Sequence, residues 1–365
     1  MIKTFEEVFE DKTKYGTKIK TEQYQKEGKN IIIDQGKEII SGYTDIQEGL
    51  FEDVPAIIFG DHTRIIKYVD RPFFLGADGV KILKSKFKDA NYKYLYYALR
   101  NIKIPNTGYN RHFKWLKEVE IEYPEIEIQT NIVKVLDKIV HIMNVKRKEI
   151  NNLNTLIKSR FTEMFGDPIV NSLRWPEELI GDSNFVTKLA GFEYTQYIHY
   201  EKSGDVVMVK AQNVKNGKLN RKDLSYISNE VSNSLPRSQL AVGDVVMTYV
   251  GANIGDVAVI DDEYKYHLAP NVAKIRPNAE KYNSVYFMYM LMFLNSYIVG
   301  NSADTAKAAL GMERIRKLKI FAPPMELQNQ FATFVHSIDK LKATIQKSID
   351  EAQTLFDSLM QEYFG

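Results

Sequence analysis

Two stretches of the sequence combine basic side chains with side-chain amides. The stretch at 209–222, VKAQNVKNGKLNRK, has five basic residues, four Asn or Gln residues and no acidic residue, and KTKYGTKIK at 12–20 is a second basic run. Lys, Arg, Asn and Gln are the side chains that pair with base edges and phosphates. A solvated surface loop has the same composition, and the net charge of the whole chain is only +2. Both interpretations therefore stay open from these runs alone.

The sequence contains no complete catalytic or metal-binding set. Its six histidines show no metal-ligand spacing, and it has neither a phosphate-binding loop nor a dinucleotide-binding glycine pattern. An adenine methyltransferase should carry an Asn/Asp-Pro-Pro-aromatic motif, but the nearest string, APPM at 322–325, lacks the polar first residue. DDEYK at 261–265 offers the carboxylates and lysine of a nuclease, although such strings are frequent. These observations favour a binding protein without catalytic or metal-ligating residues.

The composition indicates an ordinary globular chain. With 365 residues, 44% of them hydrophobic and 26% charged, we expect two or more domains. The longest apolar run, at 288–300, is shorter than the roughly 18 residues that a membrane span needs. There are no cysteines and no signal-peptide pattern at the first residues. We therefore expect a cytoplasmic protein with no membrane partner.

An internal repeat with a fixed offset of 199 residues organises the chain. SRFTEMFG at 159–166 matches SLMQEYFG at 358–365, and VEIEYPEIEIQ at 119–129 matches LKIFAPPMELQ at 318–328. An unbroken register is typical of a long helix, because one inserted residue rotates everything after it by about 100°. Upstream, NYKYLYYAL at 91–99 resembles NSVYFMYML at 283–291 at a different offset. The segments before each repeat therefore differ in length.

Apolar residues three and four apart predict two long helices, at about 125–165 and 324–363. Pro124 and Pro323 stand where each helix should begin, and Gly166 where the first should end. The sustained spacing predicts a coiled coil, with helices roughly 60 Å long. Antiparallel pairing needs no long return of the chain between them. The expected apolar stripe of the first helix comprises Ile128, Ile132, Val135, Ile139, Ile142, Ile150, Leu153, Ile157, Phe161 and Met164.

The remaining segments alternate short β-rich runs with Gly and Asp turns, and each closes with an aromatic-rich helical stretch. The predicted fold class is α+β, with two mixed domains joined by two long antiparallel helices and an internal pseudo-twofold repeat. The predicted domains are 1–123, a first helix at 124–166, a second domain at 167–322 and a second helix at 323–365.

Over essentially its whole length, the chain resembles the specificity subunit of type I restriction–modification enzymes. IEYPEIEIQTNIVKVLDKI (121–139) and IFAPPMELQNQFATFVHSID (320–339) resemble the two central repeat regions of that family. FGDHTRIIKYVDRPFFLGADGVKIL (59–83) and LAVGDVVMTYVGANIGDVAVID (240–261) resemble two forms of its target-recognition domain. The resemblance implies that each variable domain reads one half of a bipartite site in double-stranded DNA, while the helices fix the gap. Because the two domains differ in sequence, the whole site should be asymmetric.

Candidate DNA contacts follow from residue type within these segments. In the first domain they are Gly60, Asp61, His62, Thr63, Arg64, Tyr109, Asn110, Arg111, His112 and Lys114. In the second domain they are Lys210, Gln212, Asn213, Lys215, Lys218, Thr248, Tyr249, Asn253 and Lys307. Asp61 and His62 could instead cap a turn, and Asn253 could hold a tight turn through its own backbone bond. Gly251 and Gly255 are more typical of turns than of phosphate cradles.

The resemblance also implies the partners. Two methyltransferase (modification) subunits would bind along the helices, and restriction or motor subunits would join through the complex. S-adenosylmethionine, ATP and Mg²⁺ would belong to those partners, so we expect no cofactor in this chain and no methylation by the chain alone. Two alternatives fit the repeat. One is a coiled-coil interaction scaffold with protein-binding end domains, and the other is the specificity module of another type of restriction enzyme.

Overall fold

The computed structural model of the chain describes residues 1–76, 78–108, 110–300 and 309–365. These residues form two compact units. Unit 1 comprises Met1–Lys148 with Gln346–Gly365, and unit 2 comprises Glu149–Ile345. Each unit therefore contains one mixed domain together with part of each long helix. The division of the chain into domains and helices at 123, 166 and 322 stays a prediction.

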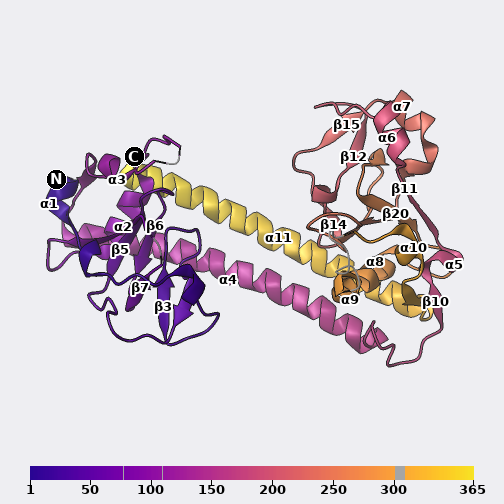
Figure 1. Cartoon of the computed structure of the whole chain (residues 1–365), viewed down its shortest axis with the longest axis horizontal. Coiled ribbons are helices and arrows are strands. Elements are labelled where there is room, and N and C mark those ends of the chain that lie inside the picture. The colour runs from indigo at the N-terminus through magenta and orange to yellow at the C-terminus, as the bar shows by residue number, and fades with distance from the viewer. Residues whose placement is uncertain (77, 109, 301–308) are drawn as a thin grey trace. The chain divides into compact units, whose positions relative to one another are not determined.

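Two helices of 40 residues each, α4 (Ile126–Phe165) and α11 (Met325–Phe364), occupy the positions that the repeat predicts (Figure 1). In unit 1, Leu136 of α4 belongs to the same buried cluster as Phe356 of α11. In unit 2, the ring of Phe161 lies 5.4 Å from that of Phe331. The first part of α4 thus packs against the last part of α11, and the reverse holds in unit 2. This is antiparallel packing, as predicted.

Gln129 and Gln328 explain why the sequence repeats a glutamine just after each proline. The amide of Gln129 donates to the carbonyl of Pro124 at 2.8 Å, and the amide of Gln328 donates to that of Pro323 at 2.7 Å. Both side chains are buried. Each glutamine therefore fixes the direction in which the chain enters its helix.

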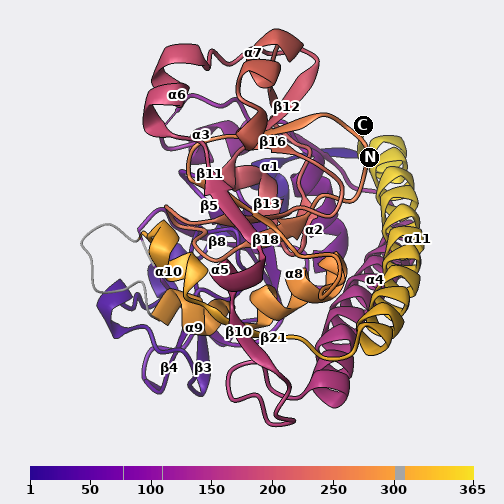
Figure 2. The ribbon, with the colours of Figure 1, turned by 90° about the vertical axis from the view of Figure 1, so that its right-hand side faces the viewer.

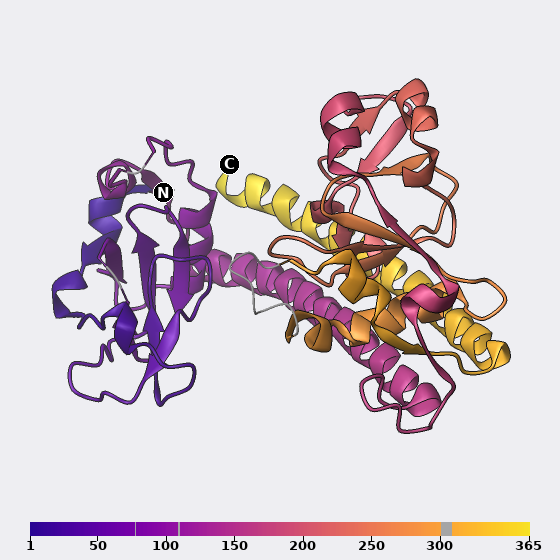
Figure 3. The same cartoon turned by 45° about the vertical axis from the view of Figure 1, so that its right-hand side comes forward.

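Unit 1 contains a four-stranded sheet, a three-stranded sheet and a two-stranded pair (Figure 3). The four-stranded sheet has the order β2 (Phe9–Asp11), β8 (Val80–Ser85), β5 (Ala56–Gly60), β6 (Ile66–Val69). The three-stranded sheet has the order β4 (Gly42–Thr44), β3 (Asn30–Ile33), β7 (Phe73–Leu75), and β1 (Ile2–Thr4) pairs with β9 (Glu120–Glu122). The helices are α1 (Phe5–Val8), α2 (Tyr92–Asn101) and α3 (Phe113–Leu116).

Unit 2 has the same plan with additional elements (Figure 2). Its sheets are β11 (Phe185–Lys188), β20 (Val272–Arg276), β17 (Val245–Thr248), β18 (Val257–Val259), and β15 (Ser225–Ile227), β12 (Val206–Val209), β19 (Tyr266–Leu268), β16 (Gln239–Leu240). β10 (Glu177–Leu179) pairs with β21 (Lys319–Phe321), and β13 (Val214–Lys215) forms a hairpin with β14 (Lys218–Leu219). The helices are α5 (Ile180–Ser183), α6 (Gly191–Tyr197), α7 (Asn229–Ser234), α8 (Ser284–Phe293), α9 (Asn295–Gly300) and α10 (Met312–Arg316).

The aromatic-rich helices α2 and α8 hold equivalent places in the two units. Each begins at an asparagine, Asn91 or Asn283, whose side chain accepts a hydrogen bond from the first turn. The buried hydroxyl of Tyr94 donates to the carbonyl of Glu122 at 2.9 Å, and that of Tyr286 donates to the carbonyl of Phe321 at 3.0 Å. Each helix is thereby tied to the strand that leads into a long helix.

The apolar stripe predicted for the first helix is partly wrong. Ile128, Val135 and Ile142 are 50%, 41% and 39% exposed. The buried apolar residues of this half are Ile132, Val133, Leu136, Ile139 and Met143. The helix carries apolar residues on more than one face, and the face that packs is the one toward α2 and α11. Spacing alone cannot tell which of two apolar faces is covered.

Among the described residues, no helix has both the length and the apolar character that crossing a bilayer requires.

Replacing Gln328 with Ala should lower the free energy of unfolding by about 2–3 kcal/mol, because three backbone partners would lose their hydrogen bonds to this buried side chain. Those partners are the carbonyls of Pro323 and Lys281 and the N–H of Asn283. Gln330 on the same helix is exposed, so Gln330→Ala is the matched control and should change stability little. Urea unfolding of both variants checks this, and equal midpoints would contradict the role given to Gln328.

Candidate nucleic-acid interface

Four loops meet at one end of the first domain, and we call them loop edge 1 (residues 34–37, 61–65, 78–79, and 105–108 with 110–112). The N–H of Asp61 donates to the carbonyl of Gly79 at 2.6 Å, and the carbonyl of Asp61 accepts from the N–H of His112 at 2.8 Å. The hydroxyl of Thr63 donates to the carbonyl of Gln35 at 2.7 Å. Residues far apart in the sequence are thus joined mainly through their backbone.

Asp61 and His112 form the buried base of this edge. A carboxylate oxygen of Asp61 accepts from the N–H of Phe113 at 2.7 Å, at the start of α3. Nδ1 of His112 lies 2.9 Å from the carbonyl of Asp61, which can only accept, so Nδ1–H is the donor. Both side chains are buried. This geometry matches the alternative in which Asp61 caps a turn, and direct contact of either side chain with DNA stays an untested prediction.

The other predicted residues of the first domain lie nearer the surface of the edge. Thr63, Asn110, Arg111 and Lys114 are exposed, and the N–H of the half-buried His62 donates to the side-chain oxygen of Gln35 at 3.2 Å. Arg64 has φ of 62° and donates to the carbonyl of Ile104 at 3.2 Å. Gly60 is buried, and a Cβ there would collide with the hydroxyl of Thr63. Tyr109 lies outside the described residues.

The second domain has the equivalent arrangement, which we call loop edge 2 (residues 210–213, 249–256, 269–271 and 309–311). The N–H of Tyr249 donates to the carbonyl of Asn271 at 2.9 Å, and its carbonyl accepts from the N–H of Leu310 at 2.8 Å. These are the two backbone bonds that Asp61 makes in the first domain. Tyr249 therefore occupies the place of Asp61 with a different side chain.

The predicted residues around Tyr249 differ in exposure. Thr248 is buried at the end of β17, whereas Asn253 is exposed. The ammonium of Lys188 lies 5.3 Å from the centre of the Tyr249 ring, a cation–π distance. The carbonyl of Asn253 accepts from the N–H of Asp256 at 3.1 Å within the turn. Lys307 lies outside the described residues. Gly251 and Gly255 have φ of 107° and 83°, as turn glycines do.

The basic run at 209–222 folds into the β13–β14 hairpin and its flanks. Lys210 donates to the carbonyl of Asp223 and to the hydroxyl of Ser225, both at 2.9 Å. Asn213 is buried and donates to the carbonyls of Asn220 and Lys222 at 2.9 and 3.1 Å. Lys218 forms an ion pair with Asp339 of α11 at 3.0 Å. Gln212 and Lys215 remain exposed, so they are the members of the run best placed to meet a ligand.

Gln35 and Asn271 of these edges, and Lys188 beside Tyr249, have structural roles that the sequence analysis did not predict. Gln35 joins two loops, and Asn271 is exposed with φ of 71°. Asn tolerates this left-handed conformation better than most residues, which was the one available signal. No local pattern marks Gln35, because its contacts lie more than 25 residues away along the chain.

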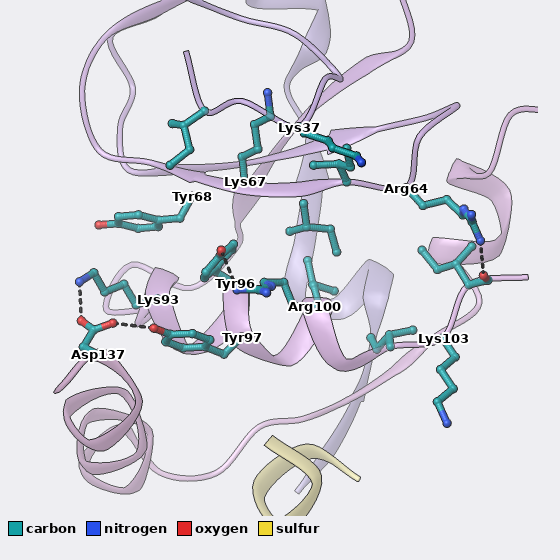
Figure 4. A pocket seen from close by; sticks show the side chains of 16 residues that line it. Lys37, Arg64, Lys67, Tyr68, Lys93, Tyr96, Tyr97, Arg100, Lys103 and Asp137 are labelled. Atoms are coloured by element: carbon teal, nitrogen blue, oxygen red, sulfur yellow. Dashed lines mark hydrogen bonds and ion pairs between the residues drawn. The ribbon is translucent and has the colours of Figure 1, made fainter. Parts of the chain in front are cut away.

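A basic cavity of about 770 Å³ extends from Arg64 along β6 and α2 to α4 (Figure 4). Its basic residues are Lys37, Arg64, Lys67, Lys93, Arg100 and Lys103, and Asp137 is its one acidic residue. Asp137 pairs with Lys93, whose pKa it raises by hydrogen bonding, and accepts from the hydroxyl of Tyr97 at 2.8 Å. Burial lowers the pKa of Lys67. Six basic residues against one acidic residue, among the described residues that line it, give the cavity an excess of positive charge.

Within the described residues, no group of three or more His, Cys, Asp or Glu side chains could hold a metal ion.

Comparison with known proteins shows which family the chain belongs to. The family described as Type I restriction modification DNA specificity domain matches residues 1–155 and 189–353, most of the chain. The chain therefore belongs to this family. The MjaVIII specificity subunit of Methanocaldococcus jannaschii is 22% identical over 318 residues, covering 79% of this chain and 74% of that protein. The EcoBI specificity subunit of Escherichia coli is 22% identical over 161 residues, covering 43% of this chain and 33% of that protein.

Solved structures share the fold. The S subunit of a type I restriction–modification system from M. genitalium superposes with a TM-score of 0.58 and 17% identity, covering all of this chain and 96% of that chain. A chain from a structure concerning complex assembly and conformational transition of the type I R-M system gives 0.57 and 14% identity, with coverage of 100% and 97%. The resemblance inferred from the sequence is thus confirmed at the level of the family and the fold.

Asn213 and Gln212 are neighbours with opposite surroundings, which provides a test of the site. Asn213→Ala should lower the free energy of unfolding by about 1–2 kcal/mol, because the buried amide no longer donates to two backbone carbonyls of the hairpin. Gln212→Ala should change it by less than about 0.5 kcal/mol, as expected of an exposed side chain. Thermal and urea unfolding measure both. A stable Asn213→Ala variant would mean that the amide does not hold this hairpin.

Proposed function

We propose that this chain is the DNA sequence-specificity subunit of a type I restriction–modification complex, and that each domain reads one half of a bipartite, asymmetric DNA site. The observation that carries the proposal is the repetition of one loop framework with different side chains. Asp61 and Tyr249 make the same two backbone bonds, yet they present different chemistry. A common frame with different exposed residues is what two unlike half-sites require.

The exposed polar residues of the loop edges are the ones we assign to DNA. In loop edge 1 these include Asn110 and Arg111, with Lys114 beside it, and in loop edge 2 they include Gln212 and Asn253. Arg can bind guanine with two hydrogen bonds, and Asn or Gln can bind adenine in the same way. Lys114 and Lys215, as point charges, suit phosphates. The buried Asp61, His112 and Asn213 would position these residues and make no contact with bases.

The long helices would set the distance between the half-sites. Two surfaces that read one face of a duplex must lie about one helical turn, roughly 34 Å, or a multiple of it apart. In unit 2 Phe161 packs against Phe331, and in unit 1 the residues 199 positions from these two, Met360 and Ile132, lie in one buried cluster. Two helices that pack through buried aromatic rings keep a fixed end-to-end length. A flexible linker would let that length vary.

The modification subunits would dock on apolar residues that the helices leave exposed. Ile142 and Leu341 are related by the 199-residue offset, and so are Leu156 and Leu355. All four are exposed, by 39%, 47%, 46% and 52%. The recurrence of exposed large apolar side chains at repeat-related positions supports an interaction surface on the helices. Since the surface occurs twice, it supports two copies of one partner. S-adenosylmethionine, ATP and Mg²⁺ would then be bound by partner subunits, and this chain would act without catalysis.

Arg111→Ala should weaken DNA binding by the assembled complex. If Arg111 reads a base, the loss should be about 1–3 kcal/mol with relaxed preference at one position, whereas a phosphate contact would lower affinity for all sequences and reduce the salt slope by about one. Lys26→Ala is the control, because Lys26 is exposed and lies outside both loop edges. The measurement is duplex binding across a salt series. Unchanged affinity and slope would remove Arg111 from the interface. If the affinity for duplex DNA does not depend on salt concentration, the result would favour a protein-binding scaffold.

Four residues inserted after Asn152 in α4 should change the spacer of the recognised site. The insertion adds about 6 Å and about 40° of rotation, and it shifts the packed residues of one helix half against α11. In a variant that still folds, both half-sites should keep their bases while the number of unspecified bases between them changes. Sequencing methylated adenines in cells that carry the complete system measures this. If the number of unspecified bases stays constant while one half-site changes its bases, the helices do not set the spacing between the half-sites.

A further inference from the structure

The outer edge of β6 is open in unit 1. β6 is the last strand of its sheet, and within the described part of the chain it pairs with β5 alone. The N–H of Gly60 donates to the carbonyl of Ile65 at 2.8 Å, which fixes the phase of this antiparallel ladder. Hydrogen bonding alternates along such a ladder, so Lys67 and Val69 bond to β5. The N–H and C=O groups of Ile66 and Tyr68 therefore point outward.

The equivalent edge in unit 2 is covered by the chain itself. β18 is the last strand of the corresponding sheet. Gly217, at the turn of the β13–β14 hairpin, donates to the carbonyl of Val257 at 3.0 Å and accepts from the N–H of Val259 at 3.3 Å. This hairpin lies in the connection from β12 to β15, residues 210–224. The corresponding connection from β3 to β4, residues 34–41, is shorter and has no hairpin. The second domain thus shows what the first lacks: an extended segment on the sheet edge.

The surroundings of the open edge are cationic. The basic cavity runs along β6, with Ile66, Lys67 and Tyr68 in its lining. Lys67 is neutralised by Asp34, and Lys93 by Asp137. The other four basic residues of the cavity, Lys37, Arg64, Arg100 and Lys103, make no ion pair within the ranges that the structure describes. Figure 4 shows Arg100 between β6 and α2, where it donates to the hydroxyl of Tyr96 at 3.2 Å.

We propose that this edge binds an extended, acidic segment of a partner protein, which adds to the sheet as a further strand beside β6. Main-chain groups of the segment would pair with Ile66 and Tyr68, as in β-strand addition. Alternate side chains of a strand point to opposite faces, so acidic residues at every second position would face Arg100 and Lys103. Both donors and acceptors point outward from β6. A protein backbone supplies both kinds of partner, whereas phosphates only accept, and this favours a peptide over DNA.

The test uses the full-length chain and two fluorescein-labelled octapeptides, one alternating Glu and Val and the other alternating Lys and Val. Fluorescence anisotropy should show binding of the acidic peptide only. Hydrogen exchange should slow in the segment that contains Ile66 and Tyr68. Arg100→Glu combined with Lys103→Glu should weaken binding by about tenfold or more, because two attractive contacts become repulsive. The matched control, Lys26→Glu with Lys88→Glu, reverses two exposed charges outside the cavity and should leave the affinity within about twofold.

Several results would overturn the proposal: no binding of the acidic peptide, equal binding of both peptides, or protection from exchange elsewhere in the chain. A duplex DNA probe provides the remaining arm. If the duplex slows exchange at β6 and the double charge reversal weakens duplex binding instead, the cavity is a phosphate contact. The proposed reading of DNA by the loop edges is tested separately through Arg111. Failure of one inference can therefore be told from failure of the other.

Discussion

Main-chain hydrogen bonds between loops fix the shape of each loop edge, and the rest of the candidate site depends on them. In both domains one residue of a turn donates to the loop that precedes the neighbouring strand of the sheet, and it accepts from the loop before a short helix. Backbone groups are the same in every residue except proline. The frame therefore survives when Asp61 is replaced by Tyr249 at the equivalent place. Exposed side chains on such a frame can vary without loss of the fold, which is the property that a family of sequence readers needs.

The long helices likewise have buried residues that hold the fold and other residues that stay exposed. Buried glutamines and aromatic rings hold the chain at the start and end of each helix, where Gln129 and Gln328 bond to the prolines that precede them. Ile142 and Leu341, by contrast, are apolar but exposed. The part of each side chain that stays at the surface, 39% and 47%, is not used by the folded monomer. The repeat thus encodes two sets of apolar residues on each helix, one that packs against its neighbour and one that stays exposed.

The sequence predicted the parts of the structure that depend on local spacing. The long helices, the prolines at their starts and the two related domains all follow from periodicity or from the 199-residue offset. The sequence did not predict which individual polar side chains are buried and which are exposed. Asn213 and Gln212 are adjacent and chemically alike, yet one is buried and the other exposed, because the β13–β14 hairpin folds back over Asn213. Lys218 meets Asp339, which lies more than 100 residues away. Such contacts depend on tertiary packing, which no short pattern in the sequence contains.

The difference between the two sheet edges follows from loop length. A longer connection between β12 and β15 supplies a hairpin that bonds to β18, whereas with the shorter connection between β3 and β4 no described residue pairs with the outer edge of β6. An uncovered strand edge invites pairing with other chains, so folded proteins usually protect it. β6 is short and carries Lys67, whose side chain is buried against Asp34; both features limit indiscriminate pairing. Neither removes the outward N–H and C=O groups of Ile66 and Tyr68. An edge that is shielded against random association, bordered by positive charge and still open at its backbone is better suited to one charged partner segment than to aggregation.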